Sequence, residues 1–267
     1  MLSLHRSIML GAALLAITVA TGCSTERKTI EKLTDLAGAE FAVPTGTVAD
    51  QLVQSVISDA KFQYYNSVLD SAMAVKAGRA DAAAYDEPIL RNIAARNPGL
   101  IVLPDRITID EYGFAVRLDD ADLKAAIDAE VGELRANGGY DEMLSRWLPD
   151  VGEPAAMPEI PEGSGEVLRF GTAAVTEPFS FYDGEREVVG FDIEIARRVA
   201  ARLGRRLEIV DMEFGSMIPA LIAGKVDFIG ACITITEERA KSVLFSNSYY
   251  TGGISALVRG SADGAEM

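Results

Sequence analysis

Histidine and cysteine are almost missing from this sequence. Of its 267 residues one is histidine, His5, and two are cysteine, Cys23 and Cys232. Residues 23–267 therefore cannot supply Ser–His–Asp or Cys–His catalysis or a histidine-ligated zinc site. If Cys23 is lipidated, Cys232 has no partner for an internal disulfide. Enzymes that use carboxylates alone remain open.

Positive charge is also scarce. The chain has 25 Lys and Arg against 40 Asp and Glu, a formal net charge of −15. Nucleic acids are held by basic patches, so this balance disfavours a nucleic-acid partner and suits a protein outside the cytoplasm. Apolar residues make up 49% of the chain, enough for one large core or two modest ones.

The N-terminal apolar run is too short to cross a bilayer. It follows His5 and Arg6 and covers residues 8–20, which is typical of a secretory signal. The next residues, VATGC at 19–23, resemble a bacterial lipobox, with alanine where leucine is usual. We expect a signal peptide at 1–22, a lipid anchor at Cys23 and a tether at 23–34. Ordinary cleavage that leaves Cys23 as a free thiol is the alternative.

Residues 223–239, AGKVDFIGACITITEER, combine a helix end, a strand, a loop and a helix start. Gly224 suits a helix C-cap, residues 226–231 suit a buried strand, and Thr236 suits a helix N-cap. A strand that leads into a helix N-terminus presents backbone N–H groups to an anion, and Arg239 could hold a carboxylate there. Pairing of Arg239 with a surface glutamate is the alternative.

Part of this stretch recurs earlier in the chain. Residues 77–81, AGRAD, match residues 223–227, AGKVD, at an offset of 146 positions. Both follow a predicted helix and precede a predicted strand. The repeat predicts two lobes of like architecture, with chance recurrence of a common helix–turn–strand sequence as the alternative.

Strands and helices alternate along the chain, which predicts an α/β fold with parallel-rich sheets. Predicted strands cover 40–43, 79–84, 100–103, 112–117, 167–172, 207–210, 226–231 and 254–258. Predicted helices cover 48–58, 67–77, 88–95, 121–136, 140–147, 190–203 and 217–223. Residues 149–166 hold four of the ten prolines and predict a semi-extended linker. Residues 260–267 predict a disordered tail.

Two stretches carry a family resemblance. Residues 190–203, GFDIEIARRVAARL, resemble the signature helix of the family 3 extracellular solute-binding proteins, the polar amino-acid receptors of ABC importers. Residues 214–250 resemble the same family's first lobe, and residues 29–147 resemble the remainder. The resemblance implies a two-lobed periplasmic-binding-protein-like fold of type II. In the family the segment order is reversed, so this chain resembles a circular permutant.

The resemblance also implies a domain division. It assigns residues 35–111 and 254–260 to the second ligand-binding lobe, and residues 112–148 and 167–251 to the first. Residues 149–166 would link the usual chain ends. Crossings near Tyr112 and residues 251–253 would form a hinge that allows closure around a ligand. A domain-swapped dimer is the competing arrangement.

The family binds a free α-amino acid between its lobes. From the first lobe, Arg239 matches the arginine that holds the α-carboxylate, and Thr234 matches a hydroxyl that contacts both charged ends. Cys232 stands where a backbone carbonyl faces the ammonium. Phe214 matches an apolar wall, with core packing as the alternative, and Thr176 stands where the family often has a stacking aromatic.

From the second lobe, Gly46 and Thr47 match the loop that binds the carboxylate, with a plain capped turn as the alternative. Asp86 matches the acid that holds the ammonium, or it caps the helix before Pro88. The family often has an acid where Ala173 stands, so a basic ligand side chain would lose that partner.

The resemblance implies a lipid-anchored receptor, periplasmic or extracellular, that delivers an amino acid to the membrane permease of an ABC importer. It implies no cofactor, no metal and no catalysis. Two alternatives remain. One is a cyclohexadienyl dehydratase-like enzyme with Glu87 or Glu177 as general acid. The other is a sensor that reports ligand occupancy to a membrane partner.

Overall fold

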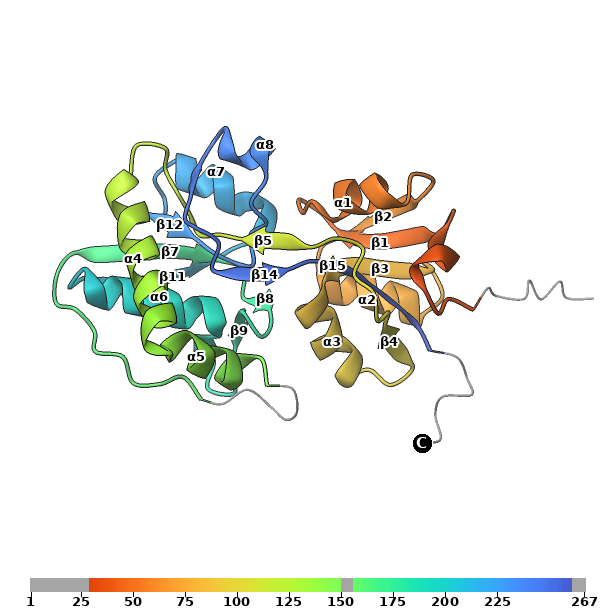
Figure 1. The fold of residues 1–267 in the computed structure, drawn as a ribbon, viewed down its shortest axis with the longest axis horizontal. Helices are drawn as coiled ribbons and strands as arrows, with labels where there is room; N and C mark the ends of the chain where they lie inside the picture. The colour runs from red at the N-terminus through yellow and green to blue at the C-terminus, as the bar shows by residue number, and fades with distance from the viewer. Residues whose placement is uncertain (1–28, 150–155, 261–267) are drawn as a thin grey trace, which may run out of the picture.

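The computed structural model describes residues 29–149 and 156–260, which form two five-stranded sheets joined by a two-stranded ribbon (Figure 1). The expected signal peptide, Cys23 and almost all of the predicted tail lie outside these ranges. Within them, no helix is both long and apolar enough to cross a membrane. The mixed α/β class with parallel-rich sheets is confirmed.

The sheet of the second lobe has the order β2-β1-β3-β15-β4. Its strands are β1 (Glu40–Pro44), β2 (Lys61–Tyr65), β3 (Ala82–Asp86), β4 (Leu100–Val102) and β15 (Ile254–Arg259). β1 runs parallel to β2 and β3, whereas β15 is antiparallel to both of its neighbours. Helix α1 (Ala49–Val56) packs on one face, and α2 (Val68–Lys76) and α3 (Glu87–Ala95) pack on the other.

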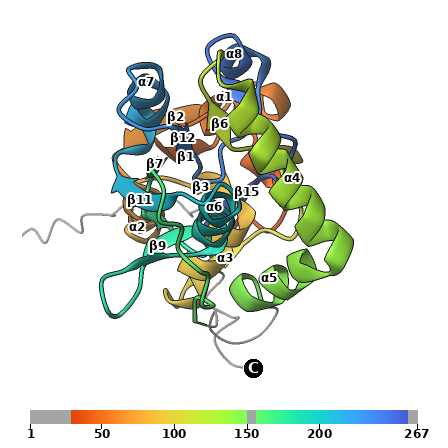
Figure 2. The same ribbon diagram turned by 90° about the vertical axis from the view of Figure 1, so that its left-hand side faces the viewer.

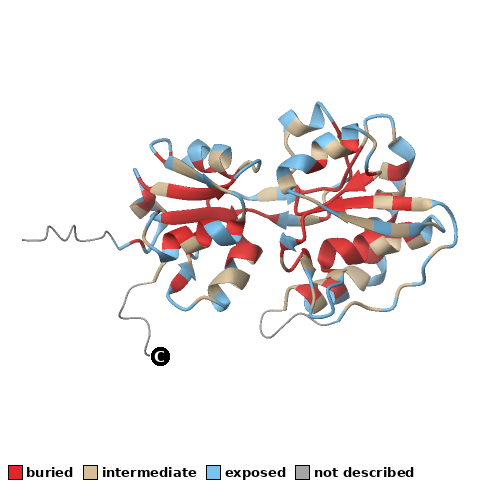
Figure 3. Ribbon diagram, turned by 180° about the vertical axis from the view of Figure 1, so that it is seen from behind, coloured by how far each residue is buried: buried red, intermediate tan, exposed pale blue. Residues whose placement is uncertain are grey.

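The sheet of the first lobe repeats this plan in the order β11-β7-β12-β6-β13. Its strands are β6 (Ala115–Val116), β7 (Val167–Thr172), β11 (Arg206–Asp211), β12 (Phe228–Ile229) and β13 (Leu244–Phe245). β7 runs parallel to β11 and β12, and β6 is antiparallel to both of its neighbours. The central strands of both sheets are mostly buried, whereas the edge strands β2 and β11 and the outer helix faces are more exposed (Figure 3).

Helices cover both faces of the first lobe's sheet. α4 (Ala121–Asn137) and α6 (Phe191–Arg202) pack together on the face that carries Phe170 and Phe228, and α7 (Met217–Ile222) covers the face that carries Ile229 (Figure 2). The short helix α5 (Gly139–Trp147) follows α4, and α8 (Glu237–Ala240) follows β12. A small sheet of β8 (Val175–Thr176), β9 (Ser180–Tyr182) and β10 (Val188–Val189) precedes α6.

A short ribbon carries both crossings between the lobes. β5 (Asp110–Tyr112) pairs antiparallel with β14 (Tyr250–Gly252), and the Tyr112 and Tyr250 rings stack with centroids 5.7 Å apart. β5 leads into β6 of the first lobe, and β14 leads into β15 of the second (Figure 1). Each large sheet therefore receives its antiparallel strand through this ribbon.

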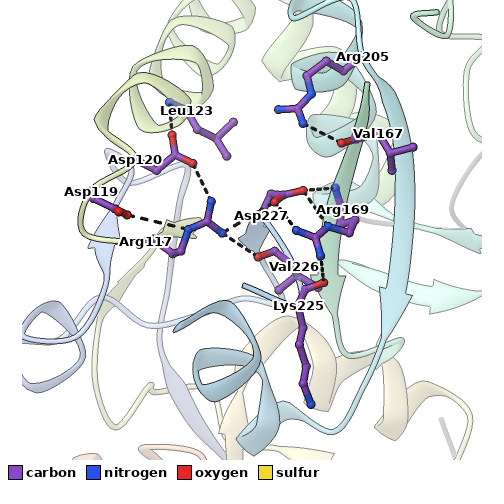
Figure 4. A network of polar contacts seen from close by, with 10 residues as sticks. All are labelled: Arg117, Asp119, Asp120, Leu123, Val167, Arg169, Arg205, Lys225, Val226 and Asp227. Carbon is purple, nitrogen blue, oxygen red and sulfur yellow. Dashed lines mark hydrogen bonds and ion pairs between the residues drawn. The ribbon is translucent and has the colours of Figure 1, made fainter. Parts of the chain in front are cut away.

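The repeated segments at residues 77–81 and 223–227 make the same hydrogen bonds in both lobes. Asp81 Oδ2 accepts from the Glu40 N–H at 2.9 Å, and the Asp81 N–H donates to Glu40 O at 2.9 Å. Asp227 and Arg169 form the same pair of bonds, both at 2.8 Å (Figure 4). Each aspartate thus joins the start of its own strand to the neighbouring parallel strand, β1 or β7, which favours lobe symmetry over chance recurrence.

Some predicted strands are shorter in the structure. The strand predicted at 112–117 divides into β5 and β6, because the Phe114 N–H donates to Ser246 Oγ at 3.0 Å instead of to a strand. The strand predicted at 226–231 keeps only β12, since the chain turns away before Cys232. β2, the small three-stranded sheet, β13 and β14 were not predicted. β2 is an edge strand without a fully buried residue, so its apolar pattern is weak.

A buried carboxylate links helices α5 and α6 of the first lobe. Glu194 of α6 is fully buried and accepts hydrogen bonds from Trp147 Nε1 at 2.7 Å and Arg146 Nη1 at 2.9 Å, both on α5. Arg198 Nη2 donates to it at 2.7 Å from the next turn of α6. Removing the carboxylate leaves two arginines and an indole N–H without their acceptor.

We predict that Glu194→Ala lowers the free energy of unfolding by about 3 kcal/mol or more, because it breaks a buried charge network. Urea denaturation followed by Trp147 fluorescence measures this. Glu133→Ala is the matched control, since Glu133 pairs with Arg202 at the surface with its side chain 61% exposed, and it should cost less than about 1 kcal/mol. Equal losses in the two variants would contradict the prediction.

Candidate functional site

Six of the eight predicted ligand-binding residues line one small cavity between the lobes, with a volume of about 10 Å³. They are Thr47, Asp86, Phe214, Cys232, Thr234 and Arg239. Thr176 lines an adjoining chamber of about 210 Å³, and Gly46 lies beside both in the β1–α1 loop. Thr47, Tyr85 and Phe214 border both spaces, so the chamber continues from the cavity.

Arg239 is placed by the start of α8. Thr236 caps this helix, its hydroxyl accepting from the Arg239 N–H at 3.2 Å, as predicted. The guanidinium donates from Nη1 to Thr234 O at 3.0 Å and lies 5.5 Å from the centre of the Phe214 ring. Burial lowers the pKa of Arg239. Among the described residues it forms no ion pair with a glutamate, so guanidinium donors remain for an anion.

Asp86 ends β3 at the same cavity. Its carboxylate is buried and accepts from the hydroxyl of Tyr112 on β5, whose oxygen in turn accepts from the Gly253 N–H at 3.2 Å. Burial raises the pKa of Asp86 to about 7. Asp86 occupies the N-cap position of α3, but its side chain makes no capping hydrogen bond. The side chain therefore faces the cavity and contacts β5 instead of capping the helix.

Cys232 holds the loop between β12 and α8 in an unusual conformation. Its φ of 51° is one that residues with a Cβ rarely adopt. Its N–H donates to Asp192 Oδ2 at 3.0 Å, and Asp192 lies fully buried in the first turn of α6. Burial raises the pKa of Asp192 to about 7 and that of the Cys232 thiol well above its usual range. Asp192 thus holds the backbone of Cys232, which lines the cavity.

The Gly46–Thr47 loop has a structural role as well as a place at the cavity. Thr47 Oγ1 donates to Pro44 O at 2.9 Å and accepts from the Ala49 N–H at 3.4 Å, which closes the turn before α1. Gly46 has a φ of 81°, and a Cβ there would lie 2.9 Å from the Cα of Gly215 in the opposite lobe. Glycine at this position allows the two lobes to meet.

Phe214 and Thr176 differ in how they face the cleft. Phe214 is half-buried and contacts the Arg239 guanidinium, so it is more than a core residue. Thr176 is buried, and its hydroxyl donates to Ala173 O at 3.1 Å, within the turn of the small sheet. Its hydroxyl is used in that turn, while the residue still borders the chamber.

The chamber carries acidic and polar groups that were not predicted. Asp211 and Glu213 from the first lobe and Asn66 and Ser67 from the second all line it. The Asp211 carboxylate is already occupied, by the Ala174 N–H at 2.9 Å and the Tyr182 hydroxyl at 3.0 Å.

Sequence reasoning missed four residues at or next to the cavity and its chamber: Tyr85, Tyr112, Asp192 and Glu213. Position after a strand could have suggested Tyr85, its neighbour Asp86 having been predicted. Tyr112 and Asp192 act through hydrogen bonds between distant segments, which no local pattern reveals.

The two glutamates considered as general acids lie elsewhere. Glu87 is held by Arg91 and by Arg106 Nη2 at 2.6 Å, and although burial alone would raise its pKa, these arginines bring it below its usual value. Glu177 pairs across the lobes with Arg96 Nη2 at 2.6 Å. Neither lines the cavity or the chamber, and a carboxylate fixed by arginine is a poor proton donor.

Comparisons with known proteins point to one family. Residues 168–264 match the model of the bacterial extracellular solute-binding proteins, family 3. The chain is 41% identical over 90 residues to the arginine-binding extracellular protein ArtP of Bacillus subtilis, covering 34% of this chain and 35% of that protein. It is 30% identical over 120 residues to the histidine-binding periplasmic protein of Escherichia coli K12, covering 45% of each.

One solved structure in the comparison is the arginine-bound form of domain 1 from TmArgBP. It is 42% identical, with a TM-score of 0.32, over 35% of this chain and 79% of that one. The chain thus matches between a third and a half of the length of the curated relatives named above. Within residues 168–264 the chain is therefore similar to the bacterial extracellular solute-binding proteins, family 3.

Proposed function

We propose that this protein captures a free α-amino acid between its two lobes. One observation carries the proposal: a cation and an acid from opposite lobes, Arg239 and Asp86, border the same buried cavity without pairing with each other. A zwitterion supplies the missing partner for each. Buried charges are stable only when paired, so a ligand with both charges suits this arrangement better than a neutral one.

The two ends of the ligand would bind as follows. The α-carboxylate would accept hydrogen bonds from the Arg239 guanidinium and from the N–H groups of the Gly46–Thr47 loop at the start of α1. The α-ammonium would donate to Asp86 and to Thr234. Since Arg239 and Thr234 belong to one lobe and Asp86 and the loop to the other, closure of the lobes completes the site.

We propose a cationic side chain for the ligand. The chamber beside the cavity has the volume for a side chain, and the exposed Glu213 carboxylate at its edge supplies a negative charge that Ala173 cannot. The relatives that are named for arginine and histidine binding support a cationic ligand side chain as well. Asp211 adds a second negative charge, although both of its oxygens already accept hydrogen bonds.

The wider role is proposed from the family. The protein would deliver its ligand to the membrane permease of an ABC importer from the periplasm or the outer cell face, held there by a lipid on Cys23. We propose further that the chain is a circular permutant, with residues 149–166 joining the two halves. Both crossings in the β5–β14 ribbon support a hinge between the lobes.

We predict that calorimetric titration with L-arginine gives one saturable site per chain. Arg239→Ala should weaken this binding at least 30-fold, because truncating one member of a buried charge pair costs about 2–5 kcal/mol. Lys241→Ala is the control, since this lysine lies two residues away at the surface and should leave the affinity within about twofold.

Two outcomes would contradict the proposal. One is the absence of heat with arginine, histidine and the other common amino acids. The other is binding whose strength is the same in the Arg239→Ala and Lys241→Ala variants.

We also predict that arginine binding weakens as the pH falls below 7. The ammonium needs an ionised Asp86, whose pKa in the ligand-free protein is about 7, so below that pH binding must first expel a proton. The affinity should fall about 16-fold between pH 7 and 5.5, with a slope that approaches tenfold per pH unit well below the pKa.

Calorimetry across this range tests the pH dependence. Asp86→Asn should bind weakly with an affinity independent of pH, whereas Asp192→Asn should keep the dependence. A flat profile in the unmodified protein, or an unchanged slope in Asp86→Asn, would contradict the assignment.

A further inference from the structure

A second cavity lies on the first lobe, where the linker packs against α6 and β11. Its volume is about 480 Å³, and it shares no lining residue with the interlobe cavity or its chamber. Residues 160–162 of the linker form one wall, and the β9–β10 turn, α6 and the edge strand β11 form the others. The linker therefore builds part of a concave surface instead of running free.

Two glycines fix the linker wall in place. The Gly165 N–H donates to Gly204 O at 2.9 Å. A Cβ on Gly163 would lie 2.2 Å from the carbonyl carbon of Gly204, and one on Gly165 would lie 2.7 Å from its oxygen. Only glycine permits this approach of the linker backbone to the turn after α6. The neighbouring residues 160–162 are thereby held over the cavity.

Three arginines from separate segments line this cavity: Arg186 in the β9–β10 turn, Arg197 on α6 and Arg205 after α6. Arg205 is partly satisfied, with Nη2 donating to Val167 O at 2.7 Å (Figure 4). Arg186 and Arg197 form no ion pair with any described residue. The Nε of Arg197 is buried and has no hydrogen-bond partner. A buried donor without an acceptor is costly, and a bound acceptor would remove that cost.

The charges and the floor of the cavity indicate the class of ligand. Two carboxylates, Glu162 and Glu187, also line it, and neither pairs with the three arginines. Three positive and two negative side chains leave one net positive charge, in a chain whose overall charge is −15. The floor is apolar, with Ile160, Leu207 and Ile209 among its residues.

We propose that this cavity binds a small organic anion with an apolar body. Its carboxylate or phosphate head would bind Arg197 and Arg186, whose guanidiniums suit two-point contact with either group. Its apolar body would lie against Leu207, Ile209 and Ile160, which bury its surface from water. The site needs the linker wall, so it is a property of the segment order of this chain.

The test is calorimetric titration of the full chain with benzoate and with phenyl phosphate, which separate the two head groups, and with neutral benzyl alcohol. We expect saturable binding of at least one anion at one site per chain and none of benzyl alcohol. Arg197→Gln should weaken the binding about tenfold or more, since it removes charge-assisted hydrogen bonds.

Two further variants keep the test decisive. Arg186 lies in a turn outside α6, so the Arg186→Gln variant tests the site even if the Arg197→Gln variant does not fold. Arg186→Gln should also weaken anion binding several-fold. Arg206→Gln is the matched control, an exposed arginine one residue beyond Arg205 that does not line the cavity, and it should change the affinity less than twofold. No saturable binding of either anion, or equal losses in the Arg186 and Arg206 variants, would overturn the proposal.

Discussion

The sheet of the second lobe cannot be completed from a continuous stretch of chain, and the sheet of the first lobe takes its antiparallel strand from the chain that precedes the linker at 149–166. The second lobe takes β15 from residues 254–259, and the first lobe takes β6 from residues 115–116. Both strands arrive through the β5–β14 ribbon, so both chain crossings between the lobes lie in one place, about which we propose that the lobes rotate. The proposed binding site lies at the carboxyl ends of parallel strands such as β1 and β3, the usual place for a ligand in open α/β sheets.

The proposed site depends on charges that the fold itself holds in place. Arg239 is oriented by Thr234 and Phe214, and Asp86 by the hydroxyl of Tyr112 on the hinge strand. Because these groups are already ordered and desolvated, a ligand pays less to order them and gains more from each contact. The contact between Asp86 and Tyr112 also joins the site to the strand about which the lobes would turn.

Local sequence patterns predicted most of the elements, whereas most of the residues that line the cavity were predicted from the family resemblance. β7 has the predicted bounds, and Thr236 caps α8 as expected, because strand periodicity and capping are encoded by near neighbours. What the sequence did not reveal depends on distant neighbours. Tyr112 resembled an ordinary buried strand residue, and Asp192 resembled a favourable acid in a first helical turn. Their polar partners come from segments more than 25 positions away. Edge strands such as β2 were missed because they bury too little apolar surface to show a pattern.

The most direct test of the two-lobed clamp is a crystal structure of the protein grown with L-arginine. The account predicts arginine between the lobes, its α-carboxylate about 3 Å from the Arg239 guanidinium and the Gly46–Thr47 loop, and its α-ammonium about 3 Å from Asp86. Its side chain should extend into the chamber towards Glu213. Arginine bound outside the cleft, or bound within it with the carboxylate at Asp86 and the ammonium at Arg239, would contradict the account.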